Sequence, residues 1–267
     1  MNALDPIIER TRHDVAARRE ASPEEAVRRV GEERLATDPP RPFADALRSP
    51  GISIIAEHKR SSPSAGVIRN DLALEDVVGA YERGGATALS VLTEPHSFAG
   101  SLEDLAAARA AVRLPILRKD FIVDSYQVVE SLARGADAIL LIVAALEPAD
   151  LERLHAEAVA LGLGVLVEVH DGRELAVAAG IGAAVIGINN RDLTTLQVNT
   201  ARTFELRDAV PDGAVVVSES GWRTRAELER LVAAGVDAVL IGEALMRSPD
   251  IEGACRALAG SRPAGRV

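Results

Sequence analysis

Eight short apolar segments recur along the chain, and each is followed by residues with helical spacing. Most of them are rich in valine, isoleucine and leucine, which suits strands that are buried on both faces. The segments span residues 52–56, 87–92, 115–119, 136–143, 164–169, 184–189, 214–219 and 237–242. Strands and helices that alternate in this way predict an α/β fold, in which helices cover a parallel sheet.

The number of strand–helix repeats favours a closed (β/α)8 barrel, the TIM barrel architecture. The chain has 267 residues, which is close to the roughly 250 that such barrels contain. An open doubly wound sheet is the alternative, and it predicts a G-x-G-x-x-G turn after the first strand. The sequence there is EHKRSSPSAG (57–66). We therefore predict a single barrel domain over residues 1–267.

Residues 1–45 precede the first predicted strand and are expected to form an N-terminal helical extension. Two charged helices are predicted in it. Ser22 and Pro23 indicate the start of the second helix, with Ser22 as its N-cap and Pro23 as its first residue. The proline-rich stretch DPPRPF (38–43) is predicted to be a stiff linker into the barrel.

Composition limits the class of protein. A hydrophobic content of 48% is ample for one large core, so a disordered chain is excluded. Cys255 is the single cysteine, which forbids an internal disulfide and is compatible with a reducing compartment. The charged N-terminal residues do not form a signal peptide, and no apolar run is long enough to cross a bilayer. We expect a cytoplasmic protein without a membrane partner.

The charge balance limits the ligands. A net charge of −10 argues against a general nucleic-acid surface. An anionic ligand must therefore be held by a local positive site. The sequence has no cysteine cluster, and its five histidines form neither HxxxH nor HExxH, so no metal-binding motif is present.

Polar residues stand at the carboxyl ends of most of the predicted strands. They are Glu57, Lys59, Lys119, Asp120, Glu168, Asn189, Glu219, Ser220, Gly242 and Glu243. Barrel enzymes place their chemistry at this end of the strands. The recurrence of such residues at one end predicts an active site at the barrel mouth.

Each of these residues also has a purely structural explanation. Glu57 and Lys59 share one face if the first strand continues through them, and otherwise they form a surface ion pair. Lys119 could already belong to the loop that follows its strand. Glu168 is harder to dismiss, because a lone carboxylate between two strand valines needs a cation or a donor. The two lysines are the available cations, so the set is stronger evidence than any member.

The loops after the seventh and eighth strands carry a phosphate-site pattern. They contain Ser220-Gly221 and Gly242-Glu243. These loops, together with a helix N-terminus, commonly bind phosphate in barrels, and glycine permits close approach to the backbone. Glycine at such turns also occurs for conformational reasons alone. Phe98 and Phe121 lie in loops after strands, where they would either cover an aromatic substrate or anchor the loops.

At this point the motifs identify a family. The chain resembles indole-3-glycerol phosphate synthases over about residues 5–258. The segments that carry the resemblance include IIAEHKRSSPSAG (54–66), PILRKDFIVDSYQV (115–128), LVEVHD (166–171), IGINNRDLTTLQVN (186–199), VSESG (217–221) and VLIGEALMR (239–247). These motifs are specific to the family rather than to barrels in general.

The resemblance implies the conversion of 1-(2-carboxyphenylamino)-1-deoxyribulose 5-phosphate to indole-3-glycerol phosphate, with loss of carbon dioxide and water. It implies no metal and no organic cofactor. It would make Lys119 the general acid on the ribulose carbonyl and Glu168 the general base of the dehydration. Lys59 would hold the carboxylate that leaves, and it is a second candidate acid.

The resemblance also implies supporting and binding residues. The group that would orient the lysines and the substrate hydroxyls comprises Glu57, Asn189 and Ser220, with Arg191 and Glu219 in support. The phosphate would be bound by Ser62, Gly221, Gly242 and Glu243, mainly through backbone N–H groups. The aromatic ring would be bounded by Phe98, Phe121, Leu140, Leu193 and Ile241. The chemistry agrees, since attack of an aromatic carbon on a ketone builds negative charge that an ammonium stabilises.

Two positions depart from the family pattern. His58 stands where many relatives have an apolar or aromatic residue, and we expect it to point away from Glu57 and Lys59. Ser61 stands where some members have a lysine near the phosphate, so a side-chain phosphate contact there is in doubt. The charged N-terminal helices offer no large apolar patch, and we expect a monomer.

Three other functions are compatible with parts of the pattern. Phosphoribosylanthranilate isomerase is a related phosphate-binding barrel, but it would require a cysteine acid at the end of the first strand. An aldolase with a Schiff-base lysine would use Lys119. A non-catalytic barrel that only binds a ligand is disfavoured by the intact acid, base and phosphate positions.

Overall fold

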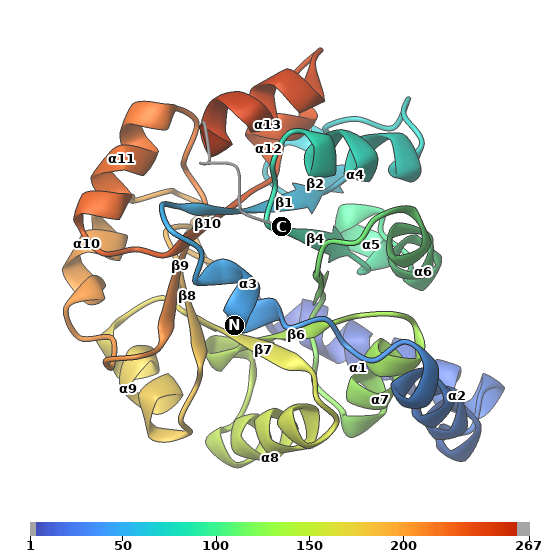
Figure 1. The fold of residues 1–267 in the computed structure, drawn as a ribbon. Helices are drawn as coiled ribbons and strands as arrows, with labels where there is room; N and C mark the ends of the chain where they lie inside the picture. The colour runs from blue at the N-terminus through green and yellow to red at the C-terminus, as the bar shows by residue number, and fades with distance from the viewer. Residues whose placement is uncertain (1–3, 261–267) are drawn as a thin grey trace.

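The computed structural model describes residues 4–260; the ends of the predicted domain, 1–3 and 261–267, lie outside the described residues. Eight parallel strands close into a barrel in the order β1-β10-β9-β8-β7-β6-β5-β4, and β1 pairs with both β10 and β4. The strands are β1 (Ser53–His58), β4 (Ala88–Leu92), β5 (Ile116–Lys119), β6 (Ala138–Ile142), β7 (Gly164–Val169), β8 (Val185–Asn189), β9 (Val215–Glu219) and β10 (Ala238–Ile241). The predicted TIM barrel is confirmed (Figure 1).

Helices surround the barrel and connect its strands (Figure 1). They are α4 (Leu74–Arg83), α5 (Pro95–Phe98), α6 (Leu102–Ala111), α7 (Ser125–Ala133), α8 (Pro148–Ala160), α9 (Gly172–Gly180), α10 (Ala201–Arg207), α11 (Arg225–Ala233), α12 (Glu243–Met246) and α13 (Ile251–Ala259), with a 3-10 turn η1 (Val143–Ala145). A short hairpin of β2 (Ser61–Ser62) and β3 (Gly66–Val67) follows β1. Among the described residues, no helix is both long and apolar enough to cross a membrane.

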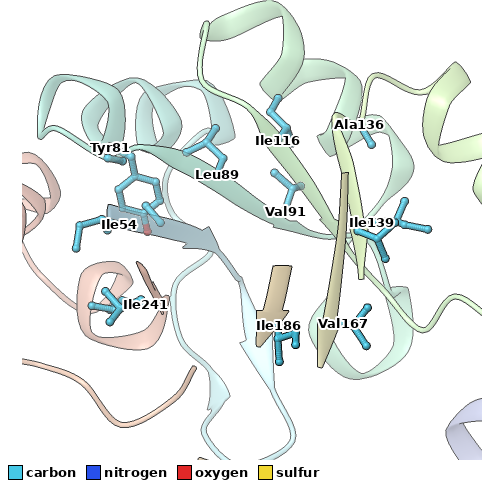
Figure 2. Close-up of a cluster of buried hydrophobic side chains, with 14 of the residues drawn as sticks. Ile54, Tyr81, Leu89, Val91, Ile116, Ala136, Ile139, Val167, Ile186 and Ile241 are labelled. Atoms are coloured by element: carbon cyan, nitrogen blue, oxygen red, sulfur yellow. The ribbon is translucent and has the colours of Figure 1, made fainter. Parts of the chain in front are cut away.

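The strands divide the apolar side chains into two layers. Ile54 and Ala56 of β1 belong to the cluster between the strands and the surrounding helices, part of which Figure 2 shows. Ile55, between them, belongs to the cluster inside the barrel. Because successive strand residues point to opposite sides, this register directs Glu57 to the inside as well. β1 extends beyond the apolar run 52–56, and its end therefore carries an acid into the barrel.

The N-terminal extension has three helices rather than the two predicted. They are α1 (Asp5–Ala21), α2 (Glu24–Thr37) and α3 (Phe43–Leu47). The expected N-cap was wrong: Ser22 ends α1, where its N–H bonds the carbonyl of Arg18, and Pro23 is the N-cap of α2 without a side-chain hydrogen bond. Proline is tolerated at the N-cap as it is at the first helical position, because the helix needs no N–H from either residue.

The extension contacts both ends of the barrel. Phe43 and Leu47 of α3 are buried in the cluster inside the barrel, so the end of the predicted linker is a helix that closes this core from below. Leu4 and Ile8, at the start of α1, form a separate apolar cluster with Val123 of the β5–α7 loop. The start of α1 thus lies at the end of the barrel where the strands terminate.

Candidate active site

A cavity of about 1170 Å³ opens at the carboxyl ends of the strands. Every residue that the sequence analysis named as catalytic or substrate-binding lines it. These residues are Glu57, Lys59, Ser62, Phe98, Lys119, Phe121, Leu140, Glu168, Asn189, Arg191, Leu193, Glu219, Ser220, Gly221, Ile241, Gly242 and Glu243. The barrel closure brings them together from all parts of the chain, because the strand ends form a ring.

Lys119 occupies the centre of the charged part of the cavity. Its Nζ lies 3.0 Å from Oε2 of Glu168 and 2.5 Å from Oε2 of Glu219. The side chains of both glutamates are almost fully buried, and that of Lys119 is 14% exposed. Lys119 and Glu219 are the last residues of β5 and β9, and Glu168 is the last but one of β7, so alternate strands of the barrel supply them.

Opposing influences set the protonation of this cluster. Burial lowers the pKa of Lys119, but the charges of Glu168, Glu219 and Glu57 outweigh it and raise that pKa. Burial raises the pKa of Glu168, but Lys119 and His170 hold it well below its usual range. Burial and the charges of the neighbouring glutamates raise the pKa of Glu219 to about 7, against the pull of Lys119. At neutral pH Lys119 is an ammonium and Glu168 is a carboxylate.

A second ion pair lies at the end of β1. Nζ of Lys59 is 2.6 Å from Oε1 of Glu57, and the Glu57 side chain is buried. Ser90 of β4 donates to the other carboxylate oxygen at 3.5 Å. His58, between the two, is buried on the helix side near Asp104 of α6, and burial lowers its pKa to about 4. It is directed away from the cavity, as expected from alternation.

Asn189 and Ser220 are joined by a hydrogen bond across β8 and β9. The Ser220 hydroxyl donates to Oδ1 of Asn189 at 2.9 Å, and the backbone N–H of Arg191 donates to the same oxygen at 3.0 Å. Ser220 has a φ of 67°, a left-handed conformation that is uncommon for serine. Asn190 supports it from behind, since its Nδ2 donates to the Ser220 carbonyl at 3.0 Å. Asn190 was not among the site residues predicted from the sequence.

The loops after β9 and β10 contribute backbone groups to the cavity that are suited to an anion. Gly221 follows Ser220, and Gly242 and Glu243 begin α12, whose first-turn N–H groups have no acceptor within the helix. Gly242 is required there, because a Cβ at this position would overlap the Glu57 carboxylate. Ser62 lines the same cavity from β2.

The apolar part of the cavity includes a wall that the sequence analysis missed. Phe121 and Leu193 pack against the cluster formed by Leu4 and Ile8, and Leu4 and Ile7 line the cavity directly. The first turn of α1 therefore covers one side of the site. The extension was predicted as helical, but nothing in its sequence indicates where on the barrel it docks.

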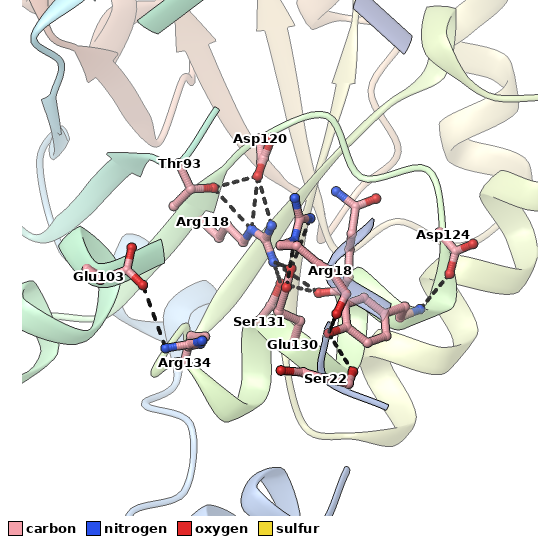
Figure 3. A network of polar contacts seen from close by, with 12 residues as sticks. Arg18, Ser22, Thr93, Glu103, Arg118, Asp120, Asp124, Glu130, Ser131 and Arg134 are labelled. Carbon is pink, nitrogen blue, oxygen red and sulfur yellow. Dashed lines mark hydrogen bonds and ion pairs between the residues drawn. The ribbon is translucent and has the colours of Figure 1, made fainter. Parts of the chain in front are cut away.

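A buried polar network joins α1 to the strand that carries Lys119 (Figure 3). The fully buried Arg118 binds Asp120 at 2.8 Å and Glu130 of α7 at 3.0 Å. Arg18 of α1 binds the other carboxylate oxygen of Glu130 at 2.8 Å. In the sequence, Arg118 is the one residue that indicates this network, because a charge within a buried strand must be paired.

Comparisons with known proteins agree with this geometry. The model of the family described as indole-3-glycerol phosphate synthase matches residues 4–258. Indole-3-glycerol phosphate synthase 2 of Streptomyces coelicolor is 53% identical over 80% of this chain and 83% of its own length. The indole-3-glycerol phosphate synthase of a Nocardioides species is 48% identical over 97% of this chain and 99% of its own. The indole-3-glycerol phosphate synthase of Mycolicibacterium smegmatis is 46% identical over 97% of this chain and 95% of its own length.

Solved structures with the same architecture are more distant in sequence. A 3-hexulose-6-phosphate synthase superposes with a TM-score of 0.64 at 13% identity, over 78% of this chain and 98% of the other. Thiamine phosphate pyrophosphorylase from Pyrococcus furiosus gives a TM-score of 0.60 at 19% identity, over 80% and 95%. At these identities the likeness shows the barrel fold alone.

Proposed function

Since this chain belongs to the indole-3-glycerol phosphate synthase family and has its activity, that of a decarboxylating lyase of tryptophan biosynthesis, we propose how its residues divide the reaction. Two lysines and two glutamates at the barrel mouth carry the proton transfers and hold the departing carboxylate. Backbone N–H groups in the loops after β9 and β10 bind the phosphate. The apolar wall bounds the aromatic ring.

The observation that carries the proposal is the placement of lysine. Lys59 and Lys119 are the only lysines in the chain, and arginine is used at every other Lys/Arg position. Both lysines line the cavity, each within 3.0 Å of a buried carboxylate. Arginine is a poor proton donor because its pKa lies far above neutral pH, whereas the pKa of an ammonium can be tuned. Lysine is thus found only at the cavity, where a cation or a proton donor is needed.

Lys119 is proposed as the acid of ring closure. The ring carbon that bears the carboxylate attacks the ketone, and the carbonyl oxygen takes a proton from the ammonium. Loss of carbon dioxide then returns the bonding electrons to the ring. In the free site the ammonium is held by Glu168 and Glu219. It must turn from at least one of them to reach the substrate, and its raised pKa keeps it protonated until then.

Glu168 is proposed as the base of the dehydration. It accepts a proton from the carbon next to nitrogen while the new hydroxyl leaves as water with a proton from a lysine. Its pKa is held low, so it is ionised and ready to accept. Asn189 and Ser220 orient the substrate hydroxyls through their linked polar groups.

The rival functions fit this geometry less well. A Schiff-base lysine must be a free amine, but the pKa of Lys119 is raised by two carboxylates that contact it. An isomerase of the phosphoribosylanthranilate type would need a cysteine at the end of β1. The chain's one cysteine, Cys255, is instead buried in α13. A non-catalytic barrel would not require the buried pair of Lys119 and Glu168.

Replacing Lys59 should remove recognition of the departing carboxylate. The probes are the reduced substrate, in which the ketone is an alcohol, and the same compound without its carboxylate. We expect Lys59→Met to weaken binding of the carboxylated probe by about 10- to 100-fold, the effect of one lost charged hydrogen bond. Binding of the probe that lacks the carboxylate should change by less than about threefold, as measured by calorimetry.

Lys119→Met is the matched variant for that experiment, because it removes the other ammonium. It should leave the preference for the carboxylated probe intact. If both variants lose the preference equally, or if Lys59→Met keeps it, Lys59 does not hold the carboxylate.

Gly187 is expected to be essential to the position of Glu219. A Cβ on this β8 residue would overlap Oε1 of Glu219, a buried oxygen without a hydrogen-bond partner. Gly187→Ala should displace the carboxylate from Lys119 and reduce kcat by about 10- to 100-fold, the usual cost of a displacement near 1 Å. The measurement is kcat together with the pH titration of the lysine side chains by NMR, in which the pKa of Lys119 should fall.

Gly180→Ala is the control for this prediction. A Cβ on Gly180, the last residue of α9, would meet no atom within 4 Å. This variant should keep the native kcat and lysine titration. An unchanged titration in Gly187→Ala would show that Glu219 is placed by something other than the missing Cβ.

A further inference from the structure

The imidazole of His170 lies directly behind Glu168. His170 follows the last residue of β7, and its Nε2 is 3.4 Å from Oε1 of Glu168. Its Nδ1 is 3.0 Å from Oε2 of Glu174, in the first turn of α9, and its backbone N–H donates to the same oxygen at 2.7 Å. The side chain is 11% exposed. One carboxylate therefore faces each nitrogen of a mostly buried ring.

This arrangement determines the protonation of the ring. Ionised carboxylates only accept hydrogen bonds, whereas a neutral imidazole has one donor and one acceptor. Either neutral tautomer would direct a lone pair at a glutamate, while the imidazolium presents one N–H to Glu174 at 3.0 Å and its positive charge to Glu168 at 3.4 Å. Burial lowers the pKa of His170, but its contacts with Glu168 and Glu174 outweigh burial and raise that pKa to about 9. His170 is thus a cation at neutral pH.

Glu168 and Glu174 are the charged groups that face His170. The neighbouring β6, β8 and η1 contain no titratable residue. On α8, which also contacts β7, Arg153 is paired with Asp150 and Glu157. On the far side of Glu168 stands Lys119, with Glu219 beyond it. Each oxygen of the Glu168 carboxylate thus faces a different cation.

The two cations have different fates during the reaction. Lys119 must turn from at least one of its two glutamates to protonate the substrate carbonyl, and a buried Glu168 left without any cation would take up a proton. A protonated Glu168 could not act as a base. His170 does not line the cavity, and its ring and backbone N–H are both anchored on Glu174.

We propose that His170 is a positioning residue whose imidazolium, anchored by Glu174, keeps the Glu168 carboxylate ionised and oriented after Lys119 has turned to the substrate. This inference rests on the proposed role of Glu168 as the base. It assigns a purpose to Nε2 of His170, a buried nitrogen that has no hydrogen-bond partner among the described residues and lies 3.4 Å from Oε1 of Glu168. It also assigns one to Glu174, a half-buried residue of α9 whose carboxylate contacts both the ring and the backbone N–H of His170.

The test compares the pH dependence of kcat in native protein, His170→Asn and Glu174→Gln. In native protein kcat should fall as pH rises through about 9, because the imidazolium is present below this pKa and lost above it. His170→Asn should lower kcat about tenfold at neutral pH, leave binding of the reduced substrate within about twofold, and lack this alkaline decline. Glu174→Gln should move the decline to lower pH, since it removes one of the two carboxylates.

His155→Asn is the matched control, because His155 is a half-buried histidine of α8 outside the cavity. It should reproduce the native profile. The same alkaline decline in His170→Asn would overturn the proposal, as would a Glu174→Gln profile identical to the native one. If His170→Asn does not fold, NMR of labelled histidine in native protein decides: His170 must remain an imidazolium above pH 8.

The role of Glu168 itself is checked separately. A Glu168→Gln variant with native kcat would contradict the proposed base. A slow Glu168→Gln variant combined with a native pH profile in His170→Asn would retain the base and reject only the part assigned to His170.

Discussion

Replacing Lys119 by methionine is expected to lower kcat by about 1,000-fold or more, with little change in the affinity for the reduced substrate. Methionine keeps the unbranched chain as far as the ε position and removes the ammonium. The substrate carbonyl then lacks both its proton donor and the positive charge that stabilises the developing oxyanion. Glu168 and Glu219 also lose the cation that they share. The measurements are product fluorescence under saturating substrate and calorimetric binding of the reduced substrate.

Lys119→Arg separates proton donation from charge. Arginine retains a cation for the two glutamates but does not give up a proton near neutral pH. We expect kcat to stay at least about 100-fold below native in this variant. Near-native kcat in Lys119→Arg would mean that the positive charge alone is needed and that the acid is another group, with Lys59 the first candidate.

NMR of protein with isotope-labelled lysine shows directly whether the remaining lysine of each variant keeps its native environment. Because the chain contains only Lys59 and Lys119, native protein with labelled lysine should show two side-chain signals. Lys119→Met removes one and so assigns both. The remaining Lys59 signal should keep its native position if the fold at the end of β1 is undisturbed.

Replacing Glu168 by glutamine is expected to lower kcat by about 100- to 1,000-fold while leaving ring closure possible. Glutamine has the shape of the carboxylate but cannot accept the proton of the dehydration. Ring closure and decarboxylation precede that step and depend on Lys119. A single-turnover experiment should therefore show Glu168→Gln releasing carbon dioxide, up to one equivalent per site, without the fluorescent indole product.

Lys119→Met is the contrasting variant in this experiment, since it should release neither carbon dioxide nor indole product. Glu219→Gln is the control for removing a buried glutamate, and its carbon dioxide and indole product should appear together. If Glu168→Gln forms both products at the native ratio, or if it releases no carbon dioxide at all, its role lies elsewhere than in the dehydration.

Much of the site could be read from the chain, because parallel strands of a barrel all end on one side. A polar residue at the end of an apolar run, such as Glu168 or Asn189, is placed at the barrel mouth by topology alone. The strand bounds followed from the same runs to within two residues. The monomeric state and the cytoplasmic location remain predictions.

Contacts across the fold could not be read in the same way. The start of α1 covers the cavity through Leu4 and Ile7, yet its sequence is that of any charged amphipathic helix. His170 lies in the motif LVEVHD, but its role depends on Glu174 of α9, which contacts its Nδ1. Gly187 lies in the motif that begins at residue 186, but its importance depends on a carboxylate from the neighbouring strand.

The sequence by itself determined the barrel, its mouth and the acids and bases that face it, since these follow from local periodicity and from the rule that parallel strands end together. Only the tertiary structure decided which carboxylates meet Lys119, and therefore the protonation of that cluster at neutral pH. Those pairings depend on distances of 3.0 Å or less between residues far apart in the chain, and electrostatic energies at that range change steeply with position.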